Sequence, residues 1–322
     1  MVKFPELNFK KIKKYPITER KNLVSIKDFA TLSKKNSVSS LVGSMPDILG
    51  GRDFKVLLDK ILTAKRNNKT IVLAIGAHVI KCGLSPLIIE LMRKGVIKAI
   101  AMNGAGAIHD YEISLIGKTS EDVAAQIGEG IFGMAAETGK ALNMAATEGA
   151  KKNSGFGNAL GKLIKREKQP HKELSIIYNA LVLDVPVTIH VAIGTDTVHM
   201  CAEADGEAIG KASLLDFRKI CSVVSTLDEG IWINMGSAVI LPEVFLKAIT
   251  VCRNIGIKVE KFLSVNIDMI PHYRPLTNVV KRPTLKGGRG INLIGQYEIL
   301  FPLLTAAILE RLEKKNENKK TF

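Results

Sequence analysis

Residues 70–78 read TIVLAIGAH, a mostly apolar run that ends in a glycine turn, and residues 96–106 repeat this pattern as VIKAIAMNGAG. Strands without polar alternation are typical of a parallel sheet that is buried on both faces. Further runs lie at 185–193, 231–240 and 262–268, and segments with helical spacing separate them. The sequence therefore predicts an α/β fold with a doubly wound, mainly parallel, Rossmann-like sheet.

The rest of the chain divides by composition. We expect a basic N-terminal arm over residues 1–35, a single α/β domain over 36–314 and a charged C-terminal tail over 315–322. Within the domain, residues 151–170 (KKNSGFGNALGKLIKREKQP) mix glycine with lysine, which predicts a mobile loop. Helices are expected at 54–66, 86–94, 119–148, 206–224, 242–254 and 299–314.

The net charge of the 322-residue chain is +15, but it is unevenly distributed. Residues 1–35, 151–172 and 311–322 together hold 22 basic and 6 acidic residues, which leaves 24 basic and 25 acidic residues elsewhere. Only 5% of the residues are aromatic, so the chain offers few platforms for base stacking. We therefore expect that nucleic acid is not a partner and that the nearly neutral body can accept a cationic small molecule.

Membrane and metal sites are not expected from the sequence. No apolar run approaches the ~20 residues of a membrane-spanning helix, and residues 1–14 lack the apolar stretch of a secretory signal. The four cysteines form no CxxC pair, and His190, His199 and Cys201 lack the spacing of metal ligands. These features predict a cytoplasmic protein with buried thiols, without a membrane partner and without a metal.

Small-residue turns follow three of the expected strands. At the carboxyl edge of a doubly wound sheet, such turns let backbone amides approach phosphate groups. They therefore predict a nucleotide or dinucleotide across this edge, and the alternative is that the glycines only shape tight turns. Neither a GxGxxG fingerprint nor a phosphate-binding P-loop motif is present. The turns are Gly76-Ala77-His78, Asn103-Gly104-Ala105-Gly106 and Gly236-Ser237.

Ionisable residues follow the second turn directly. His109 can carry a proton, and the carboxylates of Asp110 and Glu112 can anchor an ammonium group beside a cofactor. The alternative is that these residues only begin a helix, with acidic groups near its N-terminal dipole.

Two more groups of polar residues lie farther along the chain. Residues 194–207 hold four carboxylates, a density that suits a polyamine or a basic amino acid, although a solvated acidic loop is the alternative. Residues 266–290 form a Pro- and Gly-containing segment in which Lys286 or Lys281 could act as a nucleophile toward an imine. The ionisable candidates of the first group are Asp196, His199, Glu203 and Asp205.

Four motifs resemble deoxyhypusine synthase and occur in the same order: GAHVIKCG (76–83), MNGAGAIHD (102–110), NMGSAV (234–239) and YEILFPLLTAAIL (297–309). The resemblance is to a divergent, bacterial-type member of the family and covers roughly residues 50–310. It implies NAD in a Rossmann-like sheet, oxidation of spermidine beside an amine, and transfer of the aminobutyl group through a lysine imine to an acceptor. It also implies a homotetramer, arranged as a dimer of dimers.

The resemblance also assigns roles by position. It implies NAD contacts at the three glycine turns and at Asn266 and Asp268. Glu243 would replace the catalytic histidine of the family, and Lys286 would form the imine. The pattern of Asn103, His109-Asp110 and Glu112 also resembles the NAD-using ornithine cyclodeaminase domain.

Together these features predict an NAD-dependent aminoalkyl transferase that oxidises a spermidine-like amine and passes the aminoalkyl group to a protein or a small amine. An ornithine cyclodeaminase-like enzyme and a non-catalytic NAD-sensing or RNA-associated protein remain open as alternatives. The predicted catalytic residues are His109, His199, Glu243 and Lys286, and the predicted substrate-binding residues are Asp110, Glu112, Asp196, Glu203 and Asp205.

Overall fold

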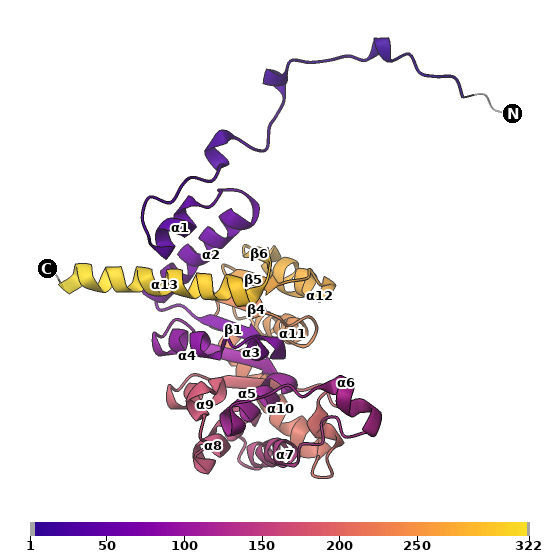
Figure 1. Cartoon of the computed structure of the whole chain (residues 1–322), viewed down its shortest axis with the longest axis vertical. Helices are drawn as coiled ribbons and strands as arrows, with labels where there is room; N and C mark the ends of the chain where they lie inside the picture. The colour runs from indigo at the N-terminus through magenta and orange to yellow at the C-terminus, as the bar shows by residue number, and fades with distance from the viewer. Residues whose placement is uncertain (1–3, 321–322) are drawn as a thin grey trace.

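Six parallel strands form the centre of the computed structural model, which describes residues 4–320 (Figure 1). The strand order is β3-β2-β1-β4-β5-β6, and every neighbouring pair is parallel. This arrangement confirms the predicted doubly wound α/β fold. The strands are β1 (Ile71–Ile75), β2 (Ala99–Asn103), β3 (Val187–His190), β4 (Ile231–Met235), β5 (Leu263–Asp268) and β6 (Arg289–Ile294).

Helices cover both faces of this sheet (Figure 1). The helices are α1 (Val38–Ser44), α2 (Leu49–Arg66), α3 (Ala77–Lys81), α4 (Ser85–Arg93), α5 (Gly104–Ile116), α6 (Val123–Gln126), α7 (Ala136–Lys151), α8 (Phe156–Glu167), α9 (Ile176–Val182), α10 (Gly206–Val224), α11 (Ile240–Asn254), α12 (Tyr273–Pro275) and α13 (Tyr297–Lys320).

The apolar strands bury both of their faces, as the sequence predicts. Every residue of β1 is buried, and its alternate side chains enter two separate cores. Leu73 packs in the core under α2, α4, α5 and α13, whereas Val72 packs in the core under α10 and α11. In the second core the indole of Trp232 stacks on Phe245, with ring centroids 4.2 Å apart.

The topology reverses between β1 and β4. The chain builds the sheet outward from β1 to β2 and β3, and it then returns to place β4, β5 and β6 on the other side of β1. In sheets of this kind, ligands bind beyond the carboxyl ends of the strands at this switch point. The turns that follow β1 and β4 therefore mark the region in which a site is expected.

Residues 151–170 are not a loop, contrary to the expectation from their composition. Phe156, Leu160, Leu163 and Ile164 recur at the three- and four-residue spacing of a helix and are buried, so the segment folds as α8. The charged tail is also helical in its backbone, because α13 continues to Lys320.

The expected helix over 119–148 is interrupted. Only its second half forms a long helix, α7, because Ser120, Gly130 and Gly133 have positive φ angles of 70°, 71° and 77° that a regular helix does not allow. The segment 118–135 instead follows an irregular path over the carboxyl edge. Strand β6 was also absent from the prediction.

The basic N-terminal arm lies outside the packed body, in an extended path with three short 3₁₀ turns (Figure 1). Among the described residues, no helix is long and apolar enough to cross a membrane. The four cysteines are free thiols, of which Cys252 is buried and the others are partly exposed.

Candidate active site at the carboxyl edge

A cavity of about 240 Å³ lies at the carboxyl edge, beyond β1, β2 and β3. Helix α3, the first turns of α5, the loop after β3 and the irregular segment 118–135 each contribute to its wall. A more open space of about 670 Å³ adjoins it and shares Glu112, Ser120 and Glu121. We call the two together the acidic cleft. The polar residues of the smaller cavity are Lys81, His109, Glu112, Ser120, Glu121, Thr195, Asp196 and Thr197.

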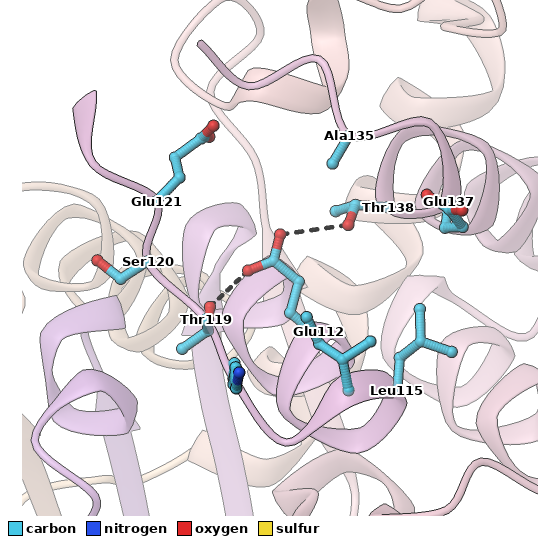
Figure 2. A pocket seen from close by; sticks show the side chains of 10 residues that line it. Glu112, Leu115, Thr119, Ser120, Glu121, Ala135, Glu137 and Thr138 are labelled. Carbon is cyan, nitrogen blue, oxygen red and sulfur yellow. Dashed lines mark hydrogen bonds between the residues drawn. The ribbon is translucent and has the colours of Figure 1, made fainter. Parts of the chain in front are cut away.

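Glu112 stands at the boundary between the two spaces, with its carboxylate held by two threonines (Figure 2). The hydroxyl of Thr119 donates to one oxygen at 2.5 Å, and the hydroxyl of Thr138 donates to the other at 3.2 Å. Burial favours a higher pKa for Glu112, but the nearby His109 ring and the hydrogen bond from Thr119 outweigh it and lower the pKa below its ordinary value. Glu112 is therefore a carboxylate at neutral pH.

His109 is linked to Glu112 through the same threonine. Its Nδ1 lies 2.6 Å from the Thr119 hydroxyl and 3.8 Å from Glu112. Because Thr119 gives its single proton to the carboxylate, Nδ1 must donate to Thr119, which assigns the tautomer from the hydrogen bonds. In neutral His109 this leaves Nε2 without a proton, so the ring is prepared to act as a general base.

The side chain of Asp196, from the loop after β3, lies against the turn after β2, where the sequence predicts phosphate contacts. Its buried carboxylate accepts a hydrogen bond from the backbone N–H of Ala105, and a Cβ on Gly104 would overlap it. Burial raises the pKa of Asp196, and His199 and the Ala105 amide oppose this rise. The Asn103 side chain accepts from Gly106 N. The predicted cofactor contacts at Asn103, Gly104, Ala105 and Gly106 are therefore replaced by contacts within the chain.

The turns after β1 and β4 meet at the switch point. Gly76 lies so close to the carbonyl oxygen of Gly236 that a Cβ could not fit, and Gly236 has a φ of 66°. Helix α3 begins at Gly76 without a side-chain cap, so the backbone N–H groups of Ala77 and His78 remain for a ligand. At the start of α11, Leu241 N instead donates to Ser237 Oγ at 3.3 Å. The turn after β1 therefore keeps backbone donors at the switch point, whereas the Ala105 and Gly106 donors of the turn after β2 are used within the chain.

Asn266 and Asp268, also predicted to contact NAD, belong to the sheet itself. Asn234, Asn266 and Asn292 are in register on β4, β5 and β6, and each side-chain amide donates to the next at 2.8 Å. Asn234 also donates to the carbonyl oxygen of Ser237 at 2.9 Å, which fixes the turn after β4. Asp268 is buried and accepts from the backbone of Met269.

Asp110 faces away from the cleft. It is completely buried and accepts hydrogen bonds from the Ser175 hydroxyl and from the backbone N–H groups of Ile176 and Ile177. Burial raises the pKa of Asp110 to about 6 against these hydrogen bonds. The carboxylate predicted to bind substrate instead caps α9.

Glu203 and Asp205, predicted to bind substrate, lie outside the cleft. His199, predicted to be catalytic, supports a loop. Glu203 and Asp205 are exposed, and Asp205 caps α10 by accepting from the backbone of its first turn. His199 Nδ1 lies 3.1 Å from Gly194 N and 3.3 Å from Asp196 N, both of which donate to it. His199 therefore holds the loop that presents Asp196.

Neither Lys286 nor Glu243 lines the acidic cleft. Lys286 is exposed and immediately precedes the start of β6, so it lies at the amino edge of the sheet, opposite the cleft. This position contradicts a role as imine former in the acidic cleft. Glu243, in the first turn of α11, pairs with Lys247 and Arg274 and accepts from Asn278, and these groups lower its pKa.

Lys81, Thr119, Ser120 and Glu121 were not predicted as site residues. Lys81 lies five residues after Gly76, at the end of the short helix α3. The signal that could have identified it is a short helix predicted to begin directly after the Gly76 turn. The segment 118–121 was expected to be a helix start, and nothing in its composition indicates that it folds back over His109.

No family model and no curated protein sequence matches the chain. Solved structures share its fold, with 62 matching chains. AgrE in complex with ornithine and NAD⁺ is 12% identical over 82% of this chain, with a TM-score of 0.55, and this chain spans only 34% of AgrE. A LOR/SDH protein of Methanococcus maripaludis is 17% identical, with a TM-score of 0.51 and coverage of 89% of this chain and 73% of the other. A deoxyhypusine synthase-like protein of Entamoeba histolytica is 12% identical, with a TM-score of 0.52 and coverage of 88% and 96%. At these identities the likeness shows a shared fold.

Proposed function

We propose that the chain is an NAD-dependent enzyme that oxidises an amine-bearing carbon of a small cationic substrate bound in the acidic cleft. The observation that carries this proposal is the chain of hydrogen bonds from His109 through Thr119 to Glu112, which ends in a cavity at the carboxyl edge of a doubly wound sheet. A base, an orienting group and a carboxylate partner are the components of general-base catalysis.

The substrate ammonium is the group that the cleft suits best. Glu112, Glu121 and Asp196 line the smaller cavity from three different segments, and Lys81 is the lysine among the described residues of its wall. An ammonium group must lose a proton before its carbon can be oxidised to an imine. His109 Nε2 accepts this proton, and the ionised Glu112 stabilises the resulting imidazolium through Thr119.

The neighbouring turns supply the cofactor side of the proposal. The backbone N–H groups of Ala77, His78 and Ser237 would hold the phosphates of a pyridine dinucleotide. When bound, this group would supply the two-electron acceptor for the substrate carbon. AgrE, which shares this fold over 34% of its length, forms a ternary complex with ornithine and NAD⁺, and this complex supports the pairing of an amine with the dinucleotide.

Lys81 separates two reactions for the same site. Aminoalkyl transfer of the deoxyhypusine synthase type needs a lysine that forms an imine in the cleft. Lys81 lines the smaller cavity, beside His109, whereas Lys118 lines the more open space. An amino-acid reaction of the ornithine cyclodeaminase type needs no enzyme imine, and Lys81 would then bind the substrate carboxylate. The mixed charge of the cavity favours the amino-acid substrate, which carries both a carboxylate and a distal ammonium group.

The test combines cofactor binding with substrate turnover. Calorimetry with NAD⁺ is followed by mass spectrometric measurement of ornithine and spermidine consumption by the NAD⁺-loaded protein. We expect NAD⁺ binding, consumption of one of the two amines, and a decrease in kcat of ~100-fold or more for His109→Gln. His272→Gln, after β5 and outside the cleft, is the matched control and should retain turnover. If His109→Gln retains full turnover, His109 is not the base.

A further inference from the structure

The N-terminal arm, residues 4–36, exposes large apolar side chains along its whole length. Eleven of them are more than half exposed, from Phe4 at 90% to Leu32 at 92%. The same segment contains Lys10, Lys11, Lys13 and Lys14, so apolar and basic groups alternate. Exposed apolar groups at this density mark an interaction site.

The arm is ordered by local contacts rather than by the body. Within the described part of the chain, the hydrogen bonds of residues 4–27 stay inside the arm, including the side-chain cap of Asn8 and the capping box between Ser25 and Asp28. It is tied to the body only near its base, where Thr31 N donates to Ser44 O and Asp47 N donates to Asp28 O. Residues 4–27 therefore extend from the body without hydrogen bonds to it, and their apolar side chains remain exposed.

A complementary surface lies at the other end of the sheet. A largely apolar groove of about 320 Å³ runs between α10 and α11 and is lined by Ile193, Leu214 and Phe217, of which Leu214 is 48% exposed and Ile193 is 64% exposed. We call this the α10–α11 groove. Glu207 lies on the same face of α10 as Gly210 and Leu214, at three- and four-residue spacing.

Carboxylates precede the end of this groove that Ile209 and Gly210 form. Glu203, Asp205 and Glu207 are exposed at the start of α10, and none of them has an ion-pair partner among the residues that the structure describes. The proposed active site uses none of the three. A segment with apolar anchors and closely spaced lysines is the chemical complement of an apolar groove with carboxylates beside one end.

We propose that the arm of one chain docks in the α10–α11 groove of a second copy, and that the two copies exchange arms reciprocally. Apolar side chains of residues 4–17 would occupy the groove, and Lys10 to Lys14 would face Glu203 and Glu207. A reciprocal exchange pairs the same two surfaces twice, which closes a dimer.

The geometry favours a second copy over the arm's own body. The arm leaves beside α1 and α13, at the β6 end, and runs away from α10, which lies at the opposite end of the molecule (Figure 1). Residues 4–27 span at most ~80 Å when fully extended, whereas a folded body of this size has a radius of gyration of ~19 Å and is ~50 Å across. The arm is therefore long enough to cross a neighbouring copy.

The test is a charge exchange in the full chain, measured as the dimer dissociation constant by sedimentation velocity. Reversing Lys10, Lys11, Lys13 and Lys14 to Glu should raise this constant by ~10-fold or more at low salt. Glu203→Lys with Glu207→Lys should do the same, and an equimolar mixture of the two variants should restore association. Leu214→Asp should also weaken the dimer by ~10-fold or more.

Matched controls separate docking from general effects. Reversing the exposed lysines 151, 162, 165 and 168 changes the net charge equally and should leave the dissociation constant unchanged. Leu285→Asp alters a leucine that is 81% exposed and far from the groove, and it should also have no effect. The proposal is overturned if the wild-type chain is monomeric at every concentration, if the mixed variants fail to associate, or if the arm binds anionic vesicles or RNA without any dimer.

Discussion

Replacing Thr119 by Val tests whether His109 is oriented through a relay. Valine keeps the shape of threonine but removes the hydroxyl that accepts from His109 Nδ1 at 2.6 Å and donates to Glu112 at 2.5 Å. The direct separation of His109 and Glu112 is 3.8 Å, which is too long for a hydrogen bond, so the two residues cannot replace the relay without moving.

The expected decrease in kcat for Thr119→Val follows from the charge of the Glu112 carboxylate, which accepts the lost hydrogen bond. A hydrogen bond to an ionised group contributes ~1.5–3 kcal/mol. At ~1.4 kcal/mol for each factor of ten, kcat should fall by ~10- to ~150-fold. KM should change by less than ~3-fold, because the relay acts on the base rather than on substrate binding.

Thr138→Val is the matched control, since Thr138 also donates to Glu112, at 3.2 Å, but does not touch His109. Both variants should lose similar stability in denaturant unfolding, while only Thr119→Val should lose most of its kcat. Amine consumption in the presence of NAD⁺ is the assay. Equal kcat values for the two variants would refute the relay and leave Glu112 as a purely electrostatic neighbour.

Three further predictions concern buried residues and the cleft. Asp216 on α10 accepts from the backbone N–H groups of Gly157 and Ile189. Burial raises the pKa of Asp216 to about 7, so its neutral form is favoured in the folded state and stability is lost as pH rises from the unfolded pKa toward 7. Between pH 5 and pH 8 the wild type should therefore lose ~2–3 kcal/mol more unfolding free energy than Asp216→Asn, measured by urea titration. Gly104→Ala should displace Asp196 and cost ~1.5–3 kcal/mol of stability, whereas Gly43→Ala, which meets open space, should cost nothing measurable. Lys81→Ala should reduce kcat/KM by ~10-fold or more, and Lys286→Ala should leave it unchanged, as measured with the amine that the wild type consumes.

The fold could be predicted from the sequence where the composition of a segment matches its burial in the folded protein. The apolar runs that became β1, β2, β4 and β5 are buried on both faces, and this requirement is visible in their composition. Strand β6 lies at the edge of the sheet, with an exposed residue at each end, so it lacks that signal. Helix α8 was mistaken for a loop because its glycines and lysines obscured a buried apolar face.

The candidate site was only partly predictable, because its parts meet through the tertiary structure. His109 and Glu112 are one helical turn apart, so their proximity follows from the sequence, whereas their link through Thr119 does not. Thr119 and Lys81 come close to these two residues only because the folded chain brings the segment 118–135 and helix α3 to the same edge of the sheet. Glycines can accommodate protein atoms as well as phosphates, so the turn at Gly104, which holds Asp196, could not be distinguished from the turn at Gly76.

The central claim is that the turns after β1 and β4 bind a pyridine dinucleotide beside the acidic cleft. A crystal structure of the full chain with NAD⁺ tests it most directly. The account predicts phosphate density against the amides of Ala77, His78 and Ser237, with the nicotinamide near His109. Absence of the dinucleotide at saturating concentration, or its density at any other edge of the sheet, would contradict it.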